Sequence, residues 1–402
     1  AYQRNVRQEN SLPHAHGINS SEYGNLALGL YLDTYTANLR YNRQVNEKQQ
    51  VIIGFQSSLM NNDFSGFEFL LPEFQSKSAG IFYFHEYRVK ENFILNAGLR
   101  LDIAQHQIES HSQPIYNSSG EATGNEILRN PEIDRNYSNL SGSTGFSWIF
   151  SRKSNLKFNL GSSYRIPTPI ELATNGIHHG NFRHELGNSS LESERSFQGD
   201  LNYTYSKENI LIGISPYFAY YNNYIYLSPT AEFSTLPGAG TLWEYRQNNA
   251  IFAGGEIKFH WSISPALQST IAAEYVYNQN LDTSLPLPLT PPASILTGIE
   301  WKLPLETFWL DNNTLYVEYR QVAAQNRVDR NERVTEGYGL LEAGLGLEFQ
   351  LGKQMLKLRI SGQNLLNEYY FNHLSRYRLL NLPEQGRNFN INLKIPFQIK
   401  NQ

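Results

Sequence analysis

Apolar and polar side chains alternate one by one along most of this chain. The alternation is clearest at these apolar positions: Ala343, Leu345, Leu347 and Phe349; Ile257, Phe259, Trp261 and Ile263; Phe389, Ile391, Leu393, Ile395 and Phe397. Successive side chains of a strand point to opposite faces, so this period predicts strands with one apolar and one polar face. We count about sixteen such strands, most of them about 10 to 15 residues long, whereas soluble strands usually have about 5 to 6 residues.

Short turns and long connections alternate between these strands. The short turns lie at 46–49, 90–92, 152–154, 207–209, 264–266 and 352–354, and the connection at 303–313 is longer than its place in the series predicts. The long connections lie near 10–26, 61–76, 107–136, 166–194, 227–242, 279–292, 323–336 and 367–385. Short turns at one end and long loops at the other are typical of bacterial outer-membrane barrels, whose short turns are periplasmic.

The predicted fold is therefore an all-β, antiparallel, up-and-down transmembrane β-barrel in the outer membrane of a Gram-negative bacterium, with extracellular long loops. A soluble propeller would share the strands but should repeat at a fixed period of about 40 to 50 residues, and we find no such period. The residues expected to face lipid include Phe389, Ile391, Leu393, Ile395, Ala343, Leu345 and Leu347. Those expected to face inward include Glu342, Glu348, Lys258 and His260.

Composition agrees with this fold and excludes several functions. The 402 residues include 26 Tyr, 22 Phe, 2 Met and no Cys, a profile that favours strands and removes disulfides and thiolate chemistry. The net charge of −4 is dispersed along the chain, so nucleic acid is not an expected partner, whereas outer-membrane lipid is. No nucleophile–base constellation or phosphate-binding loop is evident, so we expect no enzyme activity.

Three segments carry a family resemblance. They are YRIPTPIEL (164–172), FILNAGLRLD (93–102), and LRISGQNLLNEYY (358–370) followed by LPEQGRNFNINLKIPF (382–397). In their order and spacing these segments resemble TonB-dependent outer-membrane receptors, and the likeness extends over essentially the whole chain. The segment 164–172 is similar to the family's arginine–proline motif at the start of a long extracellular loop, and the segments 358–370 and 382–397 are similar to its closing strands. The segment 93–102 is also typical of the family.

The resemblance implies a receptor that imports a scarce metal or metal complex when the TonB complex acts on its plug. Such barrels have about 22 strands, so residues 1–402 are expected to be the C-terminal portion, without the plug domain and the first several strands. TonB would then be contacted through the missing N-terminal region. Zinc, haem or a ferric siderophore is the expected cargo, with no intrinsic cofactor. The alternative is a passive porin, since sixteen strands close a barrel, or a surface-binding barrel without transport.

The segment NGIHHGNFRHELGN (175–188) concentrates imidazoles in one long loop. Imidazole nitrogens bind Zn, Cu, Fe and haem iron, although a histidine in a loop is usually only solvated. The segment resembles a loop in the zinc- and haem-uptake branch of the family. The expected metal-binding residues are His178, His179, His184, Glu185, His14 and His16. Because neutral imidazole is the ligating form, capture should weaken below a pH of roughly 6.5, a midpoint that Glu185 should raise.

Tyrosines cluster in SPYFAYYNNYIYL (215–227), near the long-loop end of a strand. One interpretation is the aromatic girdle at the lipid headgroups, and the other is an aromatic platform for a siderophore or porphyrin. The candidate ligand-binding residues are Tyr220, Tyr221, Tyr224 and Arg183.

Overall fold

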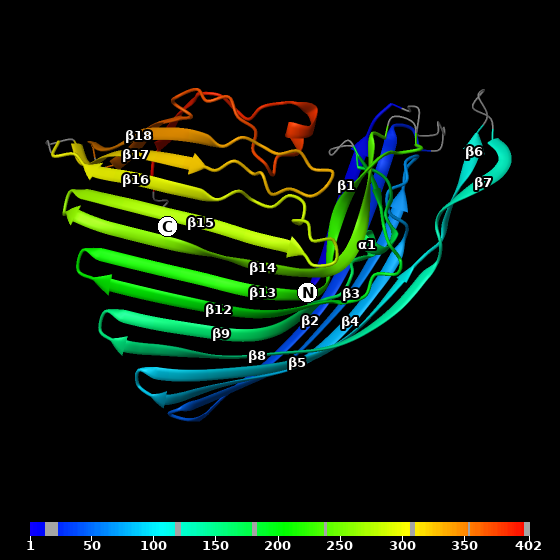
Figure 1. The fold of residues 1–402 in the computed structure, drawn as a ribbon, viewed down its shortest axis with the longest axis horizontal. Helices are drawn as coiled ribbons and strands as arrows, with labels where there is room; N and C mark the ends of the chain where they lie inside the picture. Colours follow the sequence, from blue (N-terminus) through cyan, green and yellow to red (C-terminus); the bar gives the residue numbers. More distant parts are fainter. Residues whose placement is uncertain are drawn as a thin grey trace, which may run out of the picture.

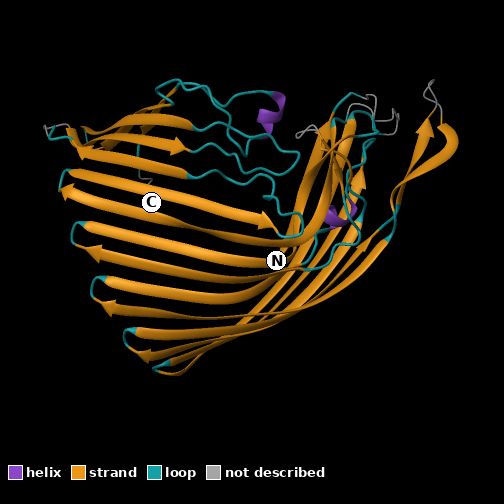
Figure 2. Ribbon diagram, viewed as in Figure 1, coloured by secondary structure: helices purple, strands orange, loops and turns teal. Residues whose placement is uncertain are grey.

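The computed structural model describes residues 1–12, 23–116, 122–178, 183–236, 239–305, 310–352 and 354–397. These residues form one sheet of 18 strands and a separate two-stranded sheet (Figures 1 and 2). The long strands are β1 (Tyr2–Asn10), β2 (Leu26–Asn46), β3 (Gln49–Ser65), β4 (Phe74–Lys90), β5 (Phe93–Ile108), β8 (Ile133–Ser151), β9 (Ser154–Arg165), β12 (Glu194–Lys207), β13 (Ile210–Phe233), β14 (Thr241–Ser264), β15 (Leu267–Asn280), β16 (Ser294–Lys302), β17 (Leu310–Val322), β18 (Tyr338–Leu351), β19 (Gln354–Gln363) and β20 (Asn388–Lys394).

The remaining elements lie in the long connections. They are β6 (His111–Tyr116) and β7 (Ala122–Asn130), which pair only with each other, helix α1 (Pro169–Ala173), strands β10 (Asn175–His178) and β11 (Arg183–Leu186), and a 3-10 helix at Arg376–Leu380. Within the described ranges, no helix is long and apolar enough to span a bilayer.

The sixteen long strands form one antiparallel meander, as predicted. Each pairs with the next long strand along the chain, and the predicted short turns at 46–49 and 352–354 lie at the same end, where the strands of Figure 1 reverse on its left side. No pairing between β1 and β20 occurs among the described residues, so the sheet is open. A closed sixteen-stranded porin would require that pairing.

Several strands are longer than the sequence pattern predicted. β13 and β14 have 24 residues each, and β13 continues to Phe233 and β14 begins at Thr241, inside the segment 227–242 that was predicted to be a loop. The physical reason is that a projecting ladder satisfies its backbone groups by pairing, whatever the hydropathy of its side chains.

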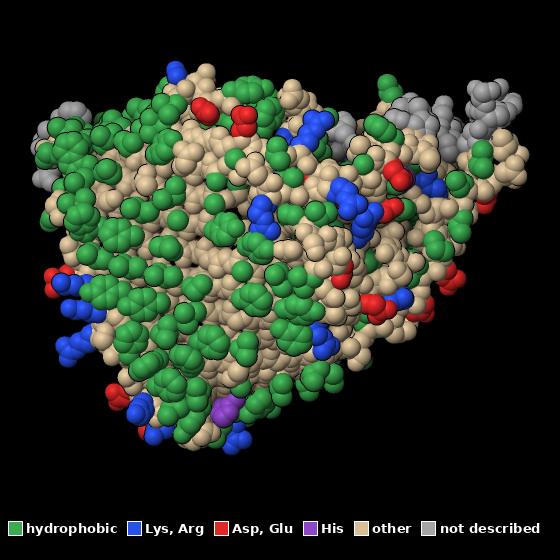
Figure 3. Space-filling view, in the orientation of Figure 1, with side chains coloured by type: hydrophobic (Ala, Val, Ile, Leu, Met, Phe, Trp, Pro, Cys, Tyr) green, Lys and Arg blue, Asp and Glu red, His purple; other side chains and the backbone are tan. Residues whose placement is uncertain are grey.

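Apolar and polar side chains lie on opposite faces of the sheet, as expected from their alternation. Ile391, Ile360 and Leu345 lie in one row across β20, β19 and β18, on the face that carries the exposed apolar residues. Lys258 and His260 lie on the other face of β14 from Ile257 and Trp261. Apolar side chains spread over the strands in Figure 3, whereas charged ones gather toward the strand ends. This distribution is typical of a surface in contact with lipid.

The long connections pack together at the end opposite the short turns. Seven buried apolar residues form a small core there, namely Leu71, Ile108, Ile133, Leu172, Ala173, Leu191 and Ile225. Since these residues come from the connections as well as the strand ends, the loops are tied to the wall of the sheet.

Candidate functional site

The histidine-rich segment folds as a short hairpin attached to the sheet. β10 and β11 pair antiparallel, with His178 opposite Arg183, and β11 pairs parallel with β14 from Arg183↔Thr241 to Leu186↔Glu244. The sheet therefore fixes the backbone of this predicted loop on both sides of its tip.

Helix α1, which leads into the hairpin, has a complete capping box. The Thr168 hydroxyl accepts the N–H of Glu171 at 3.3 Å, and the Glu171 carboxylate accepts the N–H of Thr168 at 2.7 Å. Arg165 donates to Glu171 at 2.7 Å and to Glu194 at 3.1 Å, so the arginine of the arginine–proline motif joins α1 to β12.

His184 is buried and fully hydrogen-bonded. Its Nε2 lies 2.8 Å from Asn175 Oδ1 and its Nδ1 lies 2.8 Å from Ser234 Oγ. An amide oxygen only accepts, so Nε2 carries the hydrogen and Nδ1 accepts from the serine hydroxyl. In this conformation neither nitrogen of His184 is open to a metal.

Burial, with the nearby positive charge of Arg129 adding to it, lowers the pKa of His184 to about 4. Glu185 acts in the opposite direction, as expected from the sequence, but it is outweighed. The predicted midpoint at or above 6.5 is therefore wrong for His184, because the sequence did not show that the ring is desolvated.

Arg183 and Glu185 form a buried pair instead of open ligand groups. Arg183 Nε donates to Glu185 Oε1 at 2.8 Å, and its guanidinium lies over Trp243 at 4.6 Å from the ring centroid. Both side chains are about nine-tenths buried. This pair and His184 make a rigid base for the tip of the hairpin.

Asn175 links this base to the projecting β6–β7 hairpin and was not singled out from the sequence. Its side-chain amide donates to the carbonyl of Arg129 at 2.7 Å, and Arg129 donates back to the Asn175 carbonyl. Only its position just after α1 could have suggested this role.

The other expected metal ligands cannot be placed. His14, His16 and His179 lie outside the described residues, and His178 contributes its backbone to β10 while its side chain lies outside them too. Among the residues that the structure does describe, no three His, Asp or Glu side chains are grouped to hold a metal ion.

Two of the three candidate tyrosines meet on the polar face of the sheet. The rings of Tyr221, Tyr224 and Phe252 lie with all three centroid distances at 5.2 Å. We call these three residues the aromatic cluster. Phe252 was missed from the sequence, because its place beside Tyr221 depends on the β13–β14 register.

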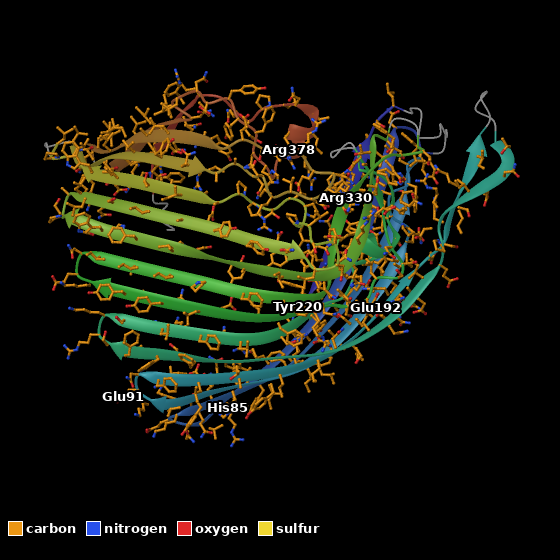
Figure 4. The ribbon with its side chains drawn as sticks, in the orientation of Figure 1. His85, Glu91, Glu192, Tyr220, Arg330 and Arg378 are labelled. Atoms are coloured by element: carbon orange, nitrogen blue, oxygen red, sulfur yellow. The ribbon has the colours of Figure 1, made fainter. Side chains whose placement is uncertain are left out.

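Tyr220 does not belong to the aromatic cluster. It pairs with Phe197 and Ile251 on the apolar face of β13, as the girdle interpretation requires, and Figure 4 labels it beside Glu192, well away from Glu91 in a short turn. Grouping Tyr220 with Tyr221 as one platform was therefore wrong, since adjacent strand residues point to opposite faces.

A second buried polar cluster ties three other long connections together. Glu332 accepts from Arg378 at 2.8 Å and from the N–H of Leu289 at 3.0 Å, and His373 Nε2 lies 3.2 Å away. Burial alone would raise the pKa of Glu332, but the close His373 ring, the hydrogen bond from Leu289 and the charge of Arg378 hold that pKa below its usual range.

An antiparallel meander with one apolar face, short turns at one end and packed long loops at the other defines an outer-membrane β-barrel protein. Residues 2–365 match the family model described as TonB dependent receptor-like, beta-barrel. The chain belongs to this family of outer-membrane transport receptors.

Several solved structures are similar to this chain over most of its length. The copper transporter OprC superposes with a TM-score of 0.72 at 18% identity, covering 96% of this chain and 60% of OprC. The FrpB iron transporter of Neisseria meningitidis gives 0.65 at 14% identity, covering 91% and 55%. The hemophore receptor HasR of Serratia marcescens, solved with its hemophore HasA and heme, gives 0.62 at 16% identity, covering 90% and 58%. The chain thus spans about 60% or less of the length of these proteins.

Proposed function

We propose that this chain is the barrel portion of a receptor that takes up a metal complex by TonB-dependent transport. The proposal is supported by the family and by the similar structures, whose names describe copper, iron and haem-related transport. Energy would come from the TonB complex, contacted through an N-terminal plug region outside this sequence.

The aromatic cluster is the observation that carries the choice of cargo. Tyr221, Tyr224 and Phe252 bring three aromatic rings together on the polar side of the sheet, near the packed loops. Aromatic rings bind flat aromatic groups by offset or edge contacts. A porphyrin or an aromatic iron chelator offers such groups, so a metal complex of this type is the favoured cargo.

Within this proposal the hairpin supplies a second contact with the cargo. His178 and His179 remain the candidate ligands of this segment, and Arg183, His184 and Glu185 would hold the base of the hairpin. His14 and His16 remain candidates to approach the same end of the barrel. A bare zinc ion is the alternative cargo, and it would depend on these histidines alone.

The test is titration of the full receptor in detergent with haem, a ferric catecholate and zinc. Replacing Tyr221 and Tyr224 together by Ala should weaken binding of one aromatic complex by about tenfold, the equivalent of about 1.4 kcal/mol. Tyr220→Ala is the matched control and should bind as the wild type, because its ring lies on the other face. If the double variant binds every complex normally while His178→Ala with His179→Ala abolishes zinc binding, the receptor takes up zinc.

A further inference from the structure

A cavity of about 590 Å³ lies on the polar face of β4, β5, β8, β9 and β12. These strands are consecutive neighbours in the sheet, as Figure 1 shows. Phe82 and Phe84 line one end of the cavity, Gln198 lines the other, and Gly98, Ser143 and Gly161 form the floor. We call this cavity the trough.

The trough adjoins the aromatic cluster. Ser196, which also lines the trough, is paired directly with Tyr221 of the cluster. One row of paired residues continues this contact across the sheet, from Phe252 through Ala219, Gln198, Gly161, Ser143 and Gly98 to Phe84. Directly paired residues share a face of the sheet, so the cluster and the trough form one continuous surface.

This row descends from the long-loop side toward the short turns. Phe252 lies 12 residues before the end of β14 at Ser264, whereas Phe84 lies 6 residues before the end of β4 at Lys90. The difference is about 20 Å along a strand, or about 15 Å along the membrane normal at the usual strand tilt. The surface therefore leads from the aromatic cluster toward the periplasmic end of the sheet.

The two glycines in the floor of the trough are not required by the fold. A Cβ at Gly98 or Gly161 would come no closer than 3.5 Å to any residue beyond its chain neighbours, which is an ordinary contact, and neither residue has a positive φ. Gly80 on β4 differs, since a Cβ there would clash with Asp102. Glycine weakens a strand interior, and it often marks a site where a ligand approaches the backbone closely. The space above Gly98 and Gly161 is therefore open to a ligand.

The trough offers hydrogen bonds but no free cation among the residues that line it. Arg100 donates from Nε to Asp102 and from Nη1 to Gln56, both at 2.7 Å, and Gln198 donates to Asp200 at 2.7 Å. The polar face of β14 to β19 carries exposed ion pairs instead. Contacts that are individually weak let a transported molecule bind and leave again.

We propose that the trough is the path by which the cargo leaves the aromatic cluster during transport. The cargo is the flat metal complex of the proposed function, on which this path depends. Its rings pass from Tyr221 and Phe252 over the glycine floor to Phe84, where a second aromatic contact receives them. The hydroxyl of Ser143 and the amide of Gln198 are transient hydrogen-bond partners on the way.

The test compares uptake with capture in the full receptor. Gly161→Leu fills the trough at a position where a Cβ has room. Uptake of haem and of a ferric catecholate by cells should fall about tenfold, because the passing complex must displace the added methylenes. Titration of the purified receptor with the same two complexes should match the wild type. Gly161→Ala, which adds one methyl group, should give intermediate uptake.

Two glycines outside the trough supply matched controls. Gly199 lies on β12 but faces the apolar side, paired with Leu160 and Phe218, and Gly213 lies on the polar face of β13 opposite Lys258. A Cβ has room at both positions. Gly199→Leu and Gly213→Leu should take up both complexes as the wild type does.

Ser143→Cys keeps the test valid if Gly161→Leu does not fold. These 402 residues contain no cysteine, so a bulky thiol reagent can be directed to this position after folding, in a receptor free of cysteine elsewhere. Uptake should fall only on labelling. Normal uptake by Gly161→Leu or by the labelled variant would overturn the path, and so would equal loss in either control or a parallel loss of binding. Failure of the wild type to bind either complex would instead contradict the proposed function.

Discussion

Tyr221 and Tyr224 lie on the same face of β13, with ring centroids 5.2 Å apart, although residues three apart in a regular strand face opposite sides. A bulge between them changes the register, since Tyr221 pairs with Ala250 and Tyr224 with Asn248. Asn223 within the bulge has a φ of 58°, a left-handed conformation that asparagine tolerates better than most residues. The aromatic cluster therefore depends on the backbone at Asn223.

Replacing Asn223 should disturb the cluster without touching a ring. Asn223→Val places a β-branched residue at positive φ and should cost about 1 to 3 kcal/mol of unfolding free energy. Cargo binding should fall toward the level of the variant in which Tyr221 and Tyr224 are both replaced by Ala. Asn223→Gly, which accepts the same φ, should retain both properties. Urea unfolding in detergent and cargo titration measure the two effects, and normal binding by Asn223→Val would show that the bulge does not position the rings.

Acid should weaken the attachment of the β10–β11 hairpin through His184. Its folded-state pKa of about 4 lies below the unfolded value of about 6.5, so the unfolded segment binds more protons in between. The contribution of neutral His184 is complete above pH 6.5 and decreases as the pH falls toward 4, by about 2 kcal/mol at pH 5. The protection factors of the amides of residues 175–178 and 183–186, corrected for the slower intrinsic exchange at lower pH, should fall between pH 7 and 5. In His184→Gln this pH dependence should be smaller; an unchanged dependence would assign it to another group.

Glu332 should hold three long connections together. Glu332→Gln leaves Arg378 buried without its carboxylate partner, a change that typically costs about 3 to 5 kcal/mol. Hydrogen exchange should rise in residues 281–293 and 364–387. Because the pKa of Glu332 is lowered, its stabilisation is present above the unfolded value of 4.5 and is lost as the pH falls through the folded value. The exposed neighbour Glu336→Gln is the control and should change neither exchange nor pH dependence.

The meander and its faces were predictable because both follow from local periodicity. The row of Ile391, Ile360 and Leu345 can be read from alternation, and each short turn has its own polar residues. The tips of β13 and β14 were not predictable from alternation. The two strands pair there through their backbones, and this pairing does not require an apolar face.

The candidate site was less predictable, since its properties depend on residues distant in sequence. His184 is buried and hydrogen-bonded to Ser234, which lies 50 positions away, and Phe252 joins the tyrosines only through the register of two strands. The composition of the segment 175–188 indicated imidazoles but not which of them the fold would enclose. The only sequence feature that indicated the bulge at Asn223 was the pair of adjacent asparagines, Asn222 and Asn223.

The final prediction tests which face of the sheet meets lipid. Leu345 lies near the middle of β18, in one row with Leu315 and Ile360, so Leu345→Arg should cost about 2 to 4 kcal/mol in refolding measurements. Glu318→Arg is the control on the opposite face, where Glu318 lies directly across from Glu342. Removing that like-charge pair should leave stability within about 0.5 kcal/mol or raise it slightly. Equal losses in the two variants would mean that the apolar face is not exposed to the bilayer, because only a lipid environment makes arginine far more costly on one face than on the other.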